Sequence, residues 1–250
     1  MQEIYHSYLK PIYEARKYPL FHVVLIAALG LIFIEFYNDV FKPVDVFRFL
    51  YQNFGVEAAN FYVRESSQLY IWAICSNIGY ILIPALYVVF NRSLKLNEMG
   101  LSLPHKSSVK LYFILLIAIL IPVFFISFTQ EFQSSYPFYR YTDDGAFIWE
   151  GLTWEILYAL QFLGVEFFFR GFLIHTSKKE LGINSVYFAM IPYVMIHFNK
   201  PLPECLGSIF AGLILGHLSY RTNSIWGGVF LHVCVAMSMD FLSMYHRAIF

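Results

Sequence analysis

Charged side chains are scarce in this sequence. Only 14% of its 250 residues are Asp, Glu, Lys or Arg, and the 17 basic residues balance the 17 acidic ones. Soluble domains carry about 25% charged residues, so the composition favours a lipid environment. Because there is no basic excess, we exclude nucleic acid as a partner.

Cysteine is scarce as well, and the zinc-protease motif HExxH is absent. The three cysteines, Cys75, Cys205 and Cys234, lie far apart in apolar stretches. An odd, scattered set of this kind excludes a disulfide framework and a site built on Cys ligands. We interpret these residues as small apolar side chains.

Long apolar runs are what the chain has in abundance, with 58% hydrophobic residues. A bilayer core of about 30 Å needs about 20 apolar residues per helix. The runs that come near this length are 20–38, 68–91, 111–129, 151–175, 202–220 and 224–245. A further run, 186–198, is shorter and contains Pro192, which predicts a short or broken helix that protein or a wet cavity must surround. We therefore predict an all-α polytopic transmembrane helical bundle of about seven membrane helices.

Stretch 41–66 mixes aromatic and polar residues, as in VFRFLYQNF, and predicts an interfacial helix. No linker or internal repeat divides the chain, so we predict one domain. Within it, 1–110 holds the first two membrane helices, the interfacial segment and a cytoplasmic loop, while 111–250 holds the core helices and the functional site.

The loops also predict an orientation. With a cytoplasmic N-terminus, the inner segments hold ten Lys and Arg residues and the outer segments six, the remaining one being Arg170 within the membrane. This bias favours a cytoplasmic N-terminus.

Ionisable residues inside apolar runs cost about 2.5–3.5 kcal/mol each, so they need partners or a purpose. Glu166 and Arg170 are four residues apart, which places them on one face of a helix. A self-neutralising ion pair that braces the bundle is one explanation for them. A functional site is the other.

Depth favours the functional explanation. At about 1.5 Å per residue from the cytoplasmic helix ends, Glu166 lies ~14 Å deep, His197 ~17 Å and His232 ~12 Å. Three separate helices thus bring one carboxylate and two imidazoles to a shared level. We assign no role to the other histidines, which lie near predicted helix ends or loops.

Two further acids lie in the last helices. Glu204 follows Pro203 at the start of a helix, where it either complements the helix dipole or approaches His197. Asp240 is eight residues after His232 and shares its helical face; we predict a structural partner such as a neighbouring Tyr or Ser.

The motifs in this half of the chain resemble those of the CPBP family, the CAAX-prenyl-protease and bacteriocin-processing intramembrane proteases. That family's first motif is a pair of glutamates, three residues and an arginine, and here residues 165–172 are VEFFFRGF. Its second motif corresponds to Tyr193 and His197, and its third to His232 and Ala236. The LNEMGLSLP segment at 96–104 is also typical of bacterial members, and the resemblance covers residues 95–245.

Two positions depart from the family pattern. Val165 replaces the first glutamate, which the family uses to activate water, and Ala236 replaces the amide or acid of the third motif. The matching residues are Glu166, Arg170, His197 and His232.

The resemblance implies an intramembrane endopeptidase that cleaves membrane-bound peptides or proteins in the bilayer of a bacterial cytoplasmic membrane. Glu166, or Glu204 in place of the missing acid, would activate water with His197. His232 would donate to the oxyanion, and Arg170 would keep Glu166 ionised. A second version uses His197, His232 and Glu166 as zinc ligands.

Two other classes of function stay open. A catalytically silent scaffold or binding protein with the CPBP fold is favoured by Val165 and Ala236. A proton-coupled transporter is favoured by buried acids, histidines and a proline-broken helix, although no inverted repeat supports it.

Overall fold

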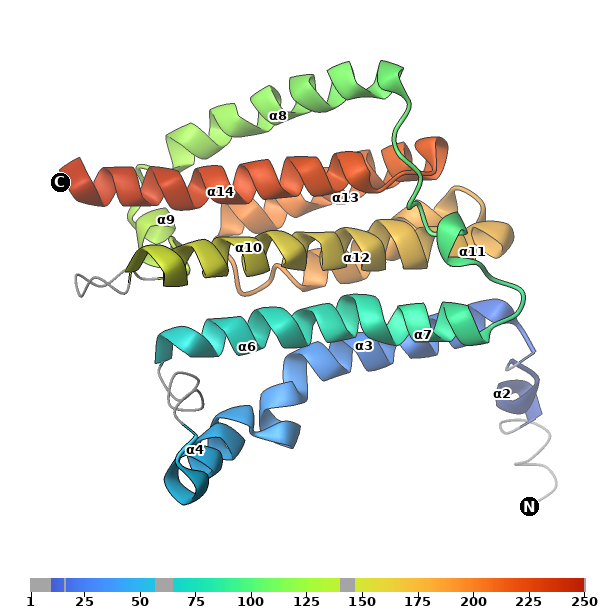
Figure 1. Ribbon diagram of the computed structural model, residues 1–250. Coiled ribbons are helices and arrows are strands. Elements are labelled where there is room, and N and C mark those ends of the chain that lie inside the picture. The colour runs from blue at the N-terminus through green and yellow to red at the C-terminus, as the bar shows by residue number, and fades with distance from the viewer. Residues whose placement is uncertain (1–9, 16, 57–64, 140–146, 250) are drawn as a thin grey trace.

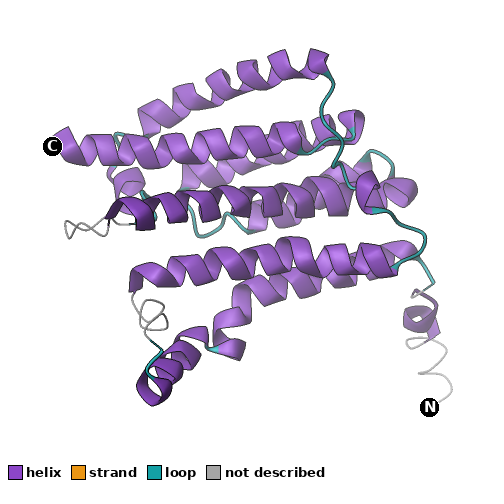
Figure 2. Cartoon of the chain, viewed as in Figure 1, coloured by secondary structure: helices purple, strands orange, loops and turns teal. Residues whose placement is uncertain are grey.

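The computed structural model describes residues 10–15, 17–56, 65–139 and 147–249. Most of these residues are helical, and within these ranges the only β pairing is an isolated antiparallel bridge between Leu101 and Ser224. Figure 2 shows helices joined by short loops. The predicted all-α helical bundle is confirmed.

In chain order, the helices are α2 (Lys10–Ala15), α3 (Pro19–Phe41), α4 (Pro43–Phe54), α6 (Glu65–Asn77), the π-helical η2 (Ile78–Leu82), α7 (Ile83–Phe90), the 3₁₀ turn η3 (Leu96–Glu98), α8 (Lys106–Ile126), α9 (Gln130–Ser135), α10 (Phe147–Glu166), the π-helical η4 (Phe167–Leu173), α11 (Ile174–Leu181), α12 (Asn184–Met195), α13 (Leu202–Thr222) and α14 (Trp226–Ile249).

Among the described residues, six helices are long and apolar enough to cross a membrane, and they correspond to the six long runs of the sequence. The chain is an integral membrane protein. The fourth run does not end near 175 as predicted, because α10, η4 and α11 continue it to Leu181. The seventh run is short, as predicted, since α12 has 12 residues. Its predicted end at 198 is wrong, because α12 ends at Met195 and His197 lies in the turn that follows.

The interfacial stretch is partly described. Helix α4 lies within it, and Lys42, with a φ of 43°, makes the corner between α3 and α4. Residues 57–64 lie outside the described part, and α6 begins at Glu65. The placement of α4 at a membrane surface stays a prediction.

The long helices lie side by side (Figure 1). On one side of the bundle, α3 packs on η2 and α7, and α6 packs on α10. On the other side, α8 packs on α14, while α12 and α13 pair closely. The continuous helix α10–η4–α11 contacts both groups and forms the centre of the bundle.

Two π-helical segments meet at this centre. Segment η2 interrupts the second membrane helix, and η4 interrupts the fourth directly after Glu166. Tyr80 of η2 packs edge-on against Phe168 of η4, with ring centroids 5.4 Å apart. Such π-helical turns are rare and frequently mark functional sites.

Candidate active site

Glu166 and Arg170 form the buried base of the site. Glu166 ends α10 and Arg170 lies in η4, and both are almost completely enclosed, with 0% and 2% of their surfaces exposed. Arg170 Nη1 lies 3.3 Å from Glu166 Oε1, which makes the i,i+4 ion pair that the sequence predicts. Arg170 Nη2 also donates to the backbone oxygen of Ala211 in α13, at 3.3 Å.

His232 completes this pair from a third helix. Its Nδ1 lies 2.9 Å from Glu166 Oε1. Its ring stacks on Phe162, one turn before Glu166, with centroids 5.5 Å apart. The His232 side chain is 17% exposed whereas that of Glu166 is 1% exposed. The site is therefore closed at its carboxylate and open at its imidazole.

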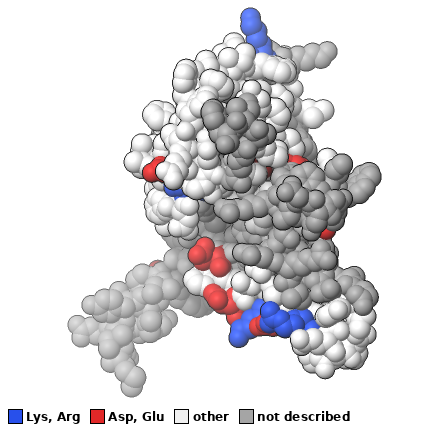
Figure 3. Space-filling model, turned by 90° about the vertical axis from the view of Figure 1, so that its left-hand side faces the viewer, with Lys and Arg blue, Asp and Glu red and all other residues white. Residues whose placement is uncertain are grey.

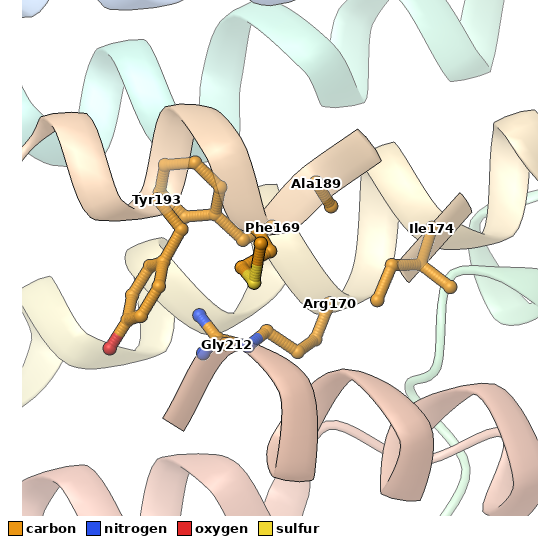
Figure 4. Close-up of a pocket in the computed structure, with 7 residues that line it drawn as sticks. Phe169, Arg170, Ile174, Ala189, Tyr193 and Gly212 are labelled. Atoms are coloured by element: carbon orange, nitrogen blue, oxygen red, sulfur yellow. The ribbon is translucent and has the colours of Figure 1, made fainter. Parts of the chain in front are cut away.

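Tyr193 of α12 connects the charged groups to both histidines. Its hydroxyl lies 2.9 Å from Nε2 of His232. The guanidinium carbon of Arg170 lies 3.8 Å from the centre of its ring, and Figure 4 shows Arg170 extending toward that ring. The same close-up shows the seam between η4, α12 and α13 that Arg170 and Tyr193 line, and this seam leaves no space for a water molecule. The sequence alone gave no role to Tyr193. Its position four residues before His197, one helical turn away, could have indicated that the two side chains meet.

His197 packs edge-on against the Tyr193 ring. The two rings are 4.8 Å apart, and His197 Nδ1 lies 2.8 Å from the backbone oxygen of Tyr193. A carbonyl only accepts, so Nδ1 carries the proton in this contact and Nε2 carries the lone pair. Burial lowers the pKa of His197 to about 4, which keeps the ring neutral near pH 7.

Gly228 makes room for the Glu166 carboxylate. A Cβ atom at this position in α14 would lie 2.0 Å from Glu166 Oε2. That oxygen is buried, and none of the described side chains or backbone groups gives it a hydrogen bond. A buried carboxylate oxygen without a donor is a place for a water or a substrate N–H group.

The two other acids lie in a separate cluster. Glu204 is in the first turn of α13, and its Oε2 accepts a hydrogen bond of 2.6 Å from Tyr136. Of the two roles predicted for Glu204, its place in the first turn of α13 agrees with complementing the helix dipole, whereas its hydrogen-bond partner is Tyr136 and not His197. Asp240 is buried, and neither of its carboxylate oxygens makes a hydrogen bond within the described part of the chain. The structural Tyr or Ser partner predicted for it is absent from that part.

The proposed zinc ligands do not fit a metal ion in this arrangement. Both nitrogens of His232 face other groups, Glu166 and Tyr193, and His197 Nδ1 faces a carbonyl. Over residues 10–15, 17–56, 65–139 and 147–249, His, Cys, Asp and Glu form no group of three suited to a metal. We therefore derive no step through zinc.

The two positions that depart from the family motifs lie in apolar surroundings. Val165 belongs to the main hydrophobic cluster around η4. Ala236 belongs to a second cluster with Tyr70, Trp154 and Tyr158. The fold has filled both places with hydrophobic contacts.

Comparison with known proteins supports the resemblance found in the motifs. Residues 147–238 match the family model of type II CAAX prenyl endopeptidase Rce1-like proteins. This segment contains Glu166, Arg170, Tyr193, His197 and His232, and the match confirms the predicted resemblance to the CPBP family. Neither a curated protein nor a solved structure matches the chain.

Proposed function

We propose that this chain, which resembles the CPBP intramembrane proteases through its Rce1-like segment, is an endopeptidase that cleaves membrane-bound peptides or proteins. One observation carries the proposal. The carboxylate of Glu166 lies 2.9 Å from one nitrogen of His232, and a hydroxyl lies 2.9 Å from the other.

A carboxylate at one nitrogen prepares an imidazole to act as a base at the other. In the proposed mechanism the proton of His232 lies on Nδ1, which faces the Glu166 carboxylate at 2.9 Å without the geometry of a hydrogen bond. The lone pair then lies on Nε2, where it can take a proton. The guanidinium of Arg170 is always charged and lies 3.3 Å from the carboxylate, so it supplies a fixed positive charge beside Glu166. In this proposal His232 is the general base, and Glu166 and Arg170 are the charged groups that orient it.

The proton and electron balance is that of ordinary amide hydrolysis. Water gives a proton to Nε2 of His232 while its oxygen forms a bond to the peptide carbonyl carbon. The Tyr193 hydroxyl faces Nε2 of His232 at rest. In the reaction it turns from that nitrogen, which takes the proton of the water, and donates its hydrogen bond to the carbonyl oxygen as this becomes negative. When the C–N bond breaks, the proton on His232 passes to the leaving amine, and His197 Nε2 holds the attacking water in place.

This assignment of roles differs from the one suggested by sequence alone. There, Glu166 activates water with His197, and His232 donates to the oxyanion. The geometry favours the reverse, because Glu166 is enclosed while His232 is partly open. Glu204 takes no part, since its carboxylate is held by Tyr136.

The test is hydrolysis by the full chain in lipid vesicles. A library of quenched fluorescent membrane peptides is added, and products are identified by mass spectrometry in ¹⁸O-labelled water. We expect a cut that introduces one labelled oxygen, and a loss of about 100-fold or more in Glu166→Gln. Glu98→Gln, which alters an exposed acid of η3, should cleave like the wild type. Equal rates in wild type and Glu166→Gln would overturn the assignment.

A silent scaffold is the second candidate, and one feature favours it. Glu166 is fully enclosed, and its neighbour Val165 offers no second carboxylate. If the wild type binds library peptides but releases none of them cut, the fold serves binding alone. No contact in the described chain favours transport.

A further inference from the structure

The first turn of α14 carries two adjacent glycines that meet different neighbours. A Cβ atom at Gly228 would overlap the Glu166 carboxylate, and one at Gly227 would overlap the Cζ atom of the Tyr112 ring in α8. Successive residues of an α-helix point about 100° apart, so the two contacts lie on different faces of this turn. The start of α14 is therefore confined between the carboxylate of α10 and the ring of α8.

The position of this turn decides where His232 lies. Gly228 and His232 are four residues apart, which places them on one face of α14. That face is directed at Glu166, whose Oε1 lies 2.9 Å from Nδ1 of His232. A shift of the first turn would therefore change the distance between the imidazole and the carboxylate. Tyr112 opposes such a shift, because its ring fills the space beside Gly227.

The Tyr112 side chain is held by two other helices. It is 3% exposed and belongs to a small hydrophobic cluster with Leu215 of α13 and Leu231 of α14. Its hydroxyl lies beside the hydroxyl of Thr222 at the end of α13, and the field of Glu166 reaches it. Because both the ring and the hydroxyl have neighbours, the side chain can act as a rigid spacer between α8 and α14.

Helix α8 contacts the rest of the described chain mainly through α14. Its outer face is apolar and exposed, as at Ile114 and Phe125. Figure 3, in which α8 lies at the top as in Figure 1, shows that the described surface there is mostly uncharged. Farther along, α8 and α14 separate at a groove of about 390 Å³ that Leu120 and Met237 help to line. The position of α8 is therefore transmitted to α14 in the half of the seam that contains Tyr112.

We propose that Tyr112 is a positioning residue of the hydrolase: its ring, which lies against Gly227, holds α14 where His232 meets the Glu166 carboxylate. The inference rests on the proposed function, because His232 is the general base there. Tyr112 acts through His232 and not on the substrate. It also lies outside residues 147–238, the segment that matches the family model, so the catalytic arrangement extends to α8.

A volume swap across this contact tests the inference. Gly227→Ala drives a methyl group into the ring, and Tyr112→Leu removes the outer half of the ring. Each single variant should lower kcat about 10-fold with KM nearly unchanged. The double variant keeps the total volume nearly constant and should recover kcat to within about threefold of the wild type. Cleavage of membrane peptides by the full chain in lipid vesicles is measured per folded protein. A purely structural role would lower only the unfolding temperature.

The ring ¹⁵N signals of His232 provide a readout that needs no cleavage. They are recorded by NMR on the full chain in lipid nanodiscs and are assigned by their loss in His232→Gln. Each single variant should move these signals, and the double variant should return them to their wild-type positions. If the wild type cuts nothing while the signals follow this pattern, the proposed function fails and the placement of His232 by Tyr112 stands.

Two further variants separate the ring contact from general effects. Tyr112→Phe keeps the ring and should recover nearly all of kcat. Phe125→Leu alters an exposed aromatic residue of the same helix and should change neither kcat nor the signals. If Gly227→Ala folds poorly, the comparison of Tyr112→Leu with Tyr112→Phe decides alone. Equal kcat and equal signals in these two variants overturn the inference, and so does a double variant no better than either single one.

Discussion

Tyr193 is the residue through which the other groups of the site meet. Its hydroxyl faces His232, its ring lies under Arg170, and its backbone oxygen faces His197. The ring and the backbone oxygen would survive the loss of the hydroxyl. A substitution can therefore separate the chemical part of this residue from its structural part.

We predict that Tyr193→Phe lowers kcat by about 10- to 100-fold and leaves KM nearly unchanged, as expected for a donor that acts on the developing oxyanion. The ring keeps its contacts with Arg170, so thermal unfolding in detergent should shift little. The measurement is the rate of membrane-peptide cleavage. Tyr187→Phe, in the exposed part of the same helix, is the matched control. A changed KM with kcat unaltered would contradict an oxyanion role.

The residues of the site differ in how far sequence could predict them. Spacing alone places Glu166 and Arg170 on one face, and their ion pair is confirmed. Depth alone brings His232 to their level, and it contacts Glu166. The orientation of His197 could not be predicted from the sequence, because His197 lies in a turn where helical periodicity does not apply. Glu204 shows the same limit, since its partner Tyr136 lies 68 residues earlier in the chain.

At the scale of elements, the site depends on how closely α14 approaches the α10–η4 junction. Gly228 is the contact point, because a Cβ there would overlap Glu166 Oε2. Gly207 in α13 is a useful counterpart, since a Cβ at that position meets nothing within 4 Å. An added methyl group is therefore blocked at Gly228 and has open space at Gly207, which makes the two glycines a matched pair for substitution.

We predict that Gly228→Ala destabilises the protein by about 1–3 kcal/mol, the usual effect of overpacking, and reduces cleavage at least 10-fold by displacing Glu166. Gly207→Ala should leave cleavage unchanged and stabilise α13 by up to about 1 kcal/mol through helix propensity. Thermal unfolding and peptide cleavage, measured on both variants, provide the comparison. A Gly228→Ala protein with full activity would show that the carboxylate does not need its observed position.

Hydropathy predicted the long helices but not their internal structure. Each of the six runs corresponds to a membrane-length helix, because a bilayer demands length and apolarity from each segment separately. The π-helical segments η2 and η4 leave no mark on hydropathy, since they change the hydrogen-bond register without changing the residues. The end of α10–η4–α11 was misplaced because its last turns are polar: Lys178 and Lys179 continue the helix beyond the apolar run.

At the scale of the whole molecule, the helix connections gather at two ends. Figure 1 places α2, the segment between α7 and α8, and the turn between α13 and α14 at one end. Helix α9, the start of α10 and the end of α14 lie at the other. The first end holds Lys10, Arg92, Lys95, Lys178 and Arg221, which are among the ten basic residues assigned to the inner side. His232, six residues into α14, is about 9 Å from this end.

We predict that this basic end faces the cytoplasm, because Lys and Arg close to membrane helices are retained on that side. Ser102 lies exposed at the basic end and Ser134 lies exposed in α9 at the opposite end. A membrane-impermeant maleimide mass tag, applied to intact cells, should therefore label Ser134→Cys at once and Ser102→Cys only after permeabilisation. The wild type measures the background from its three half-buried cysteines. The reverse labelling pattern would place His232 near the outer surface, and the substrates would then be peptides that enter from that side.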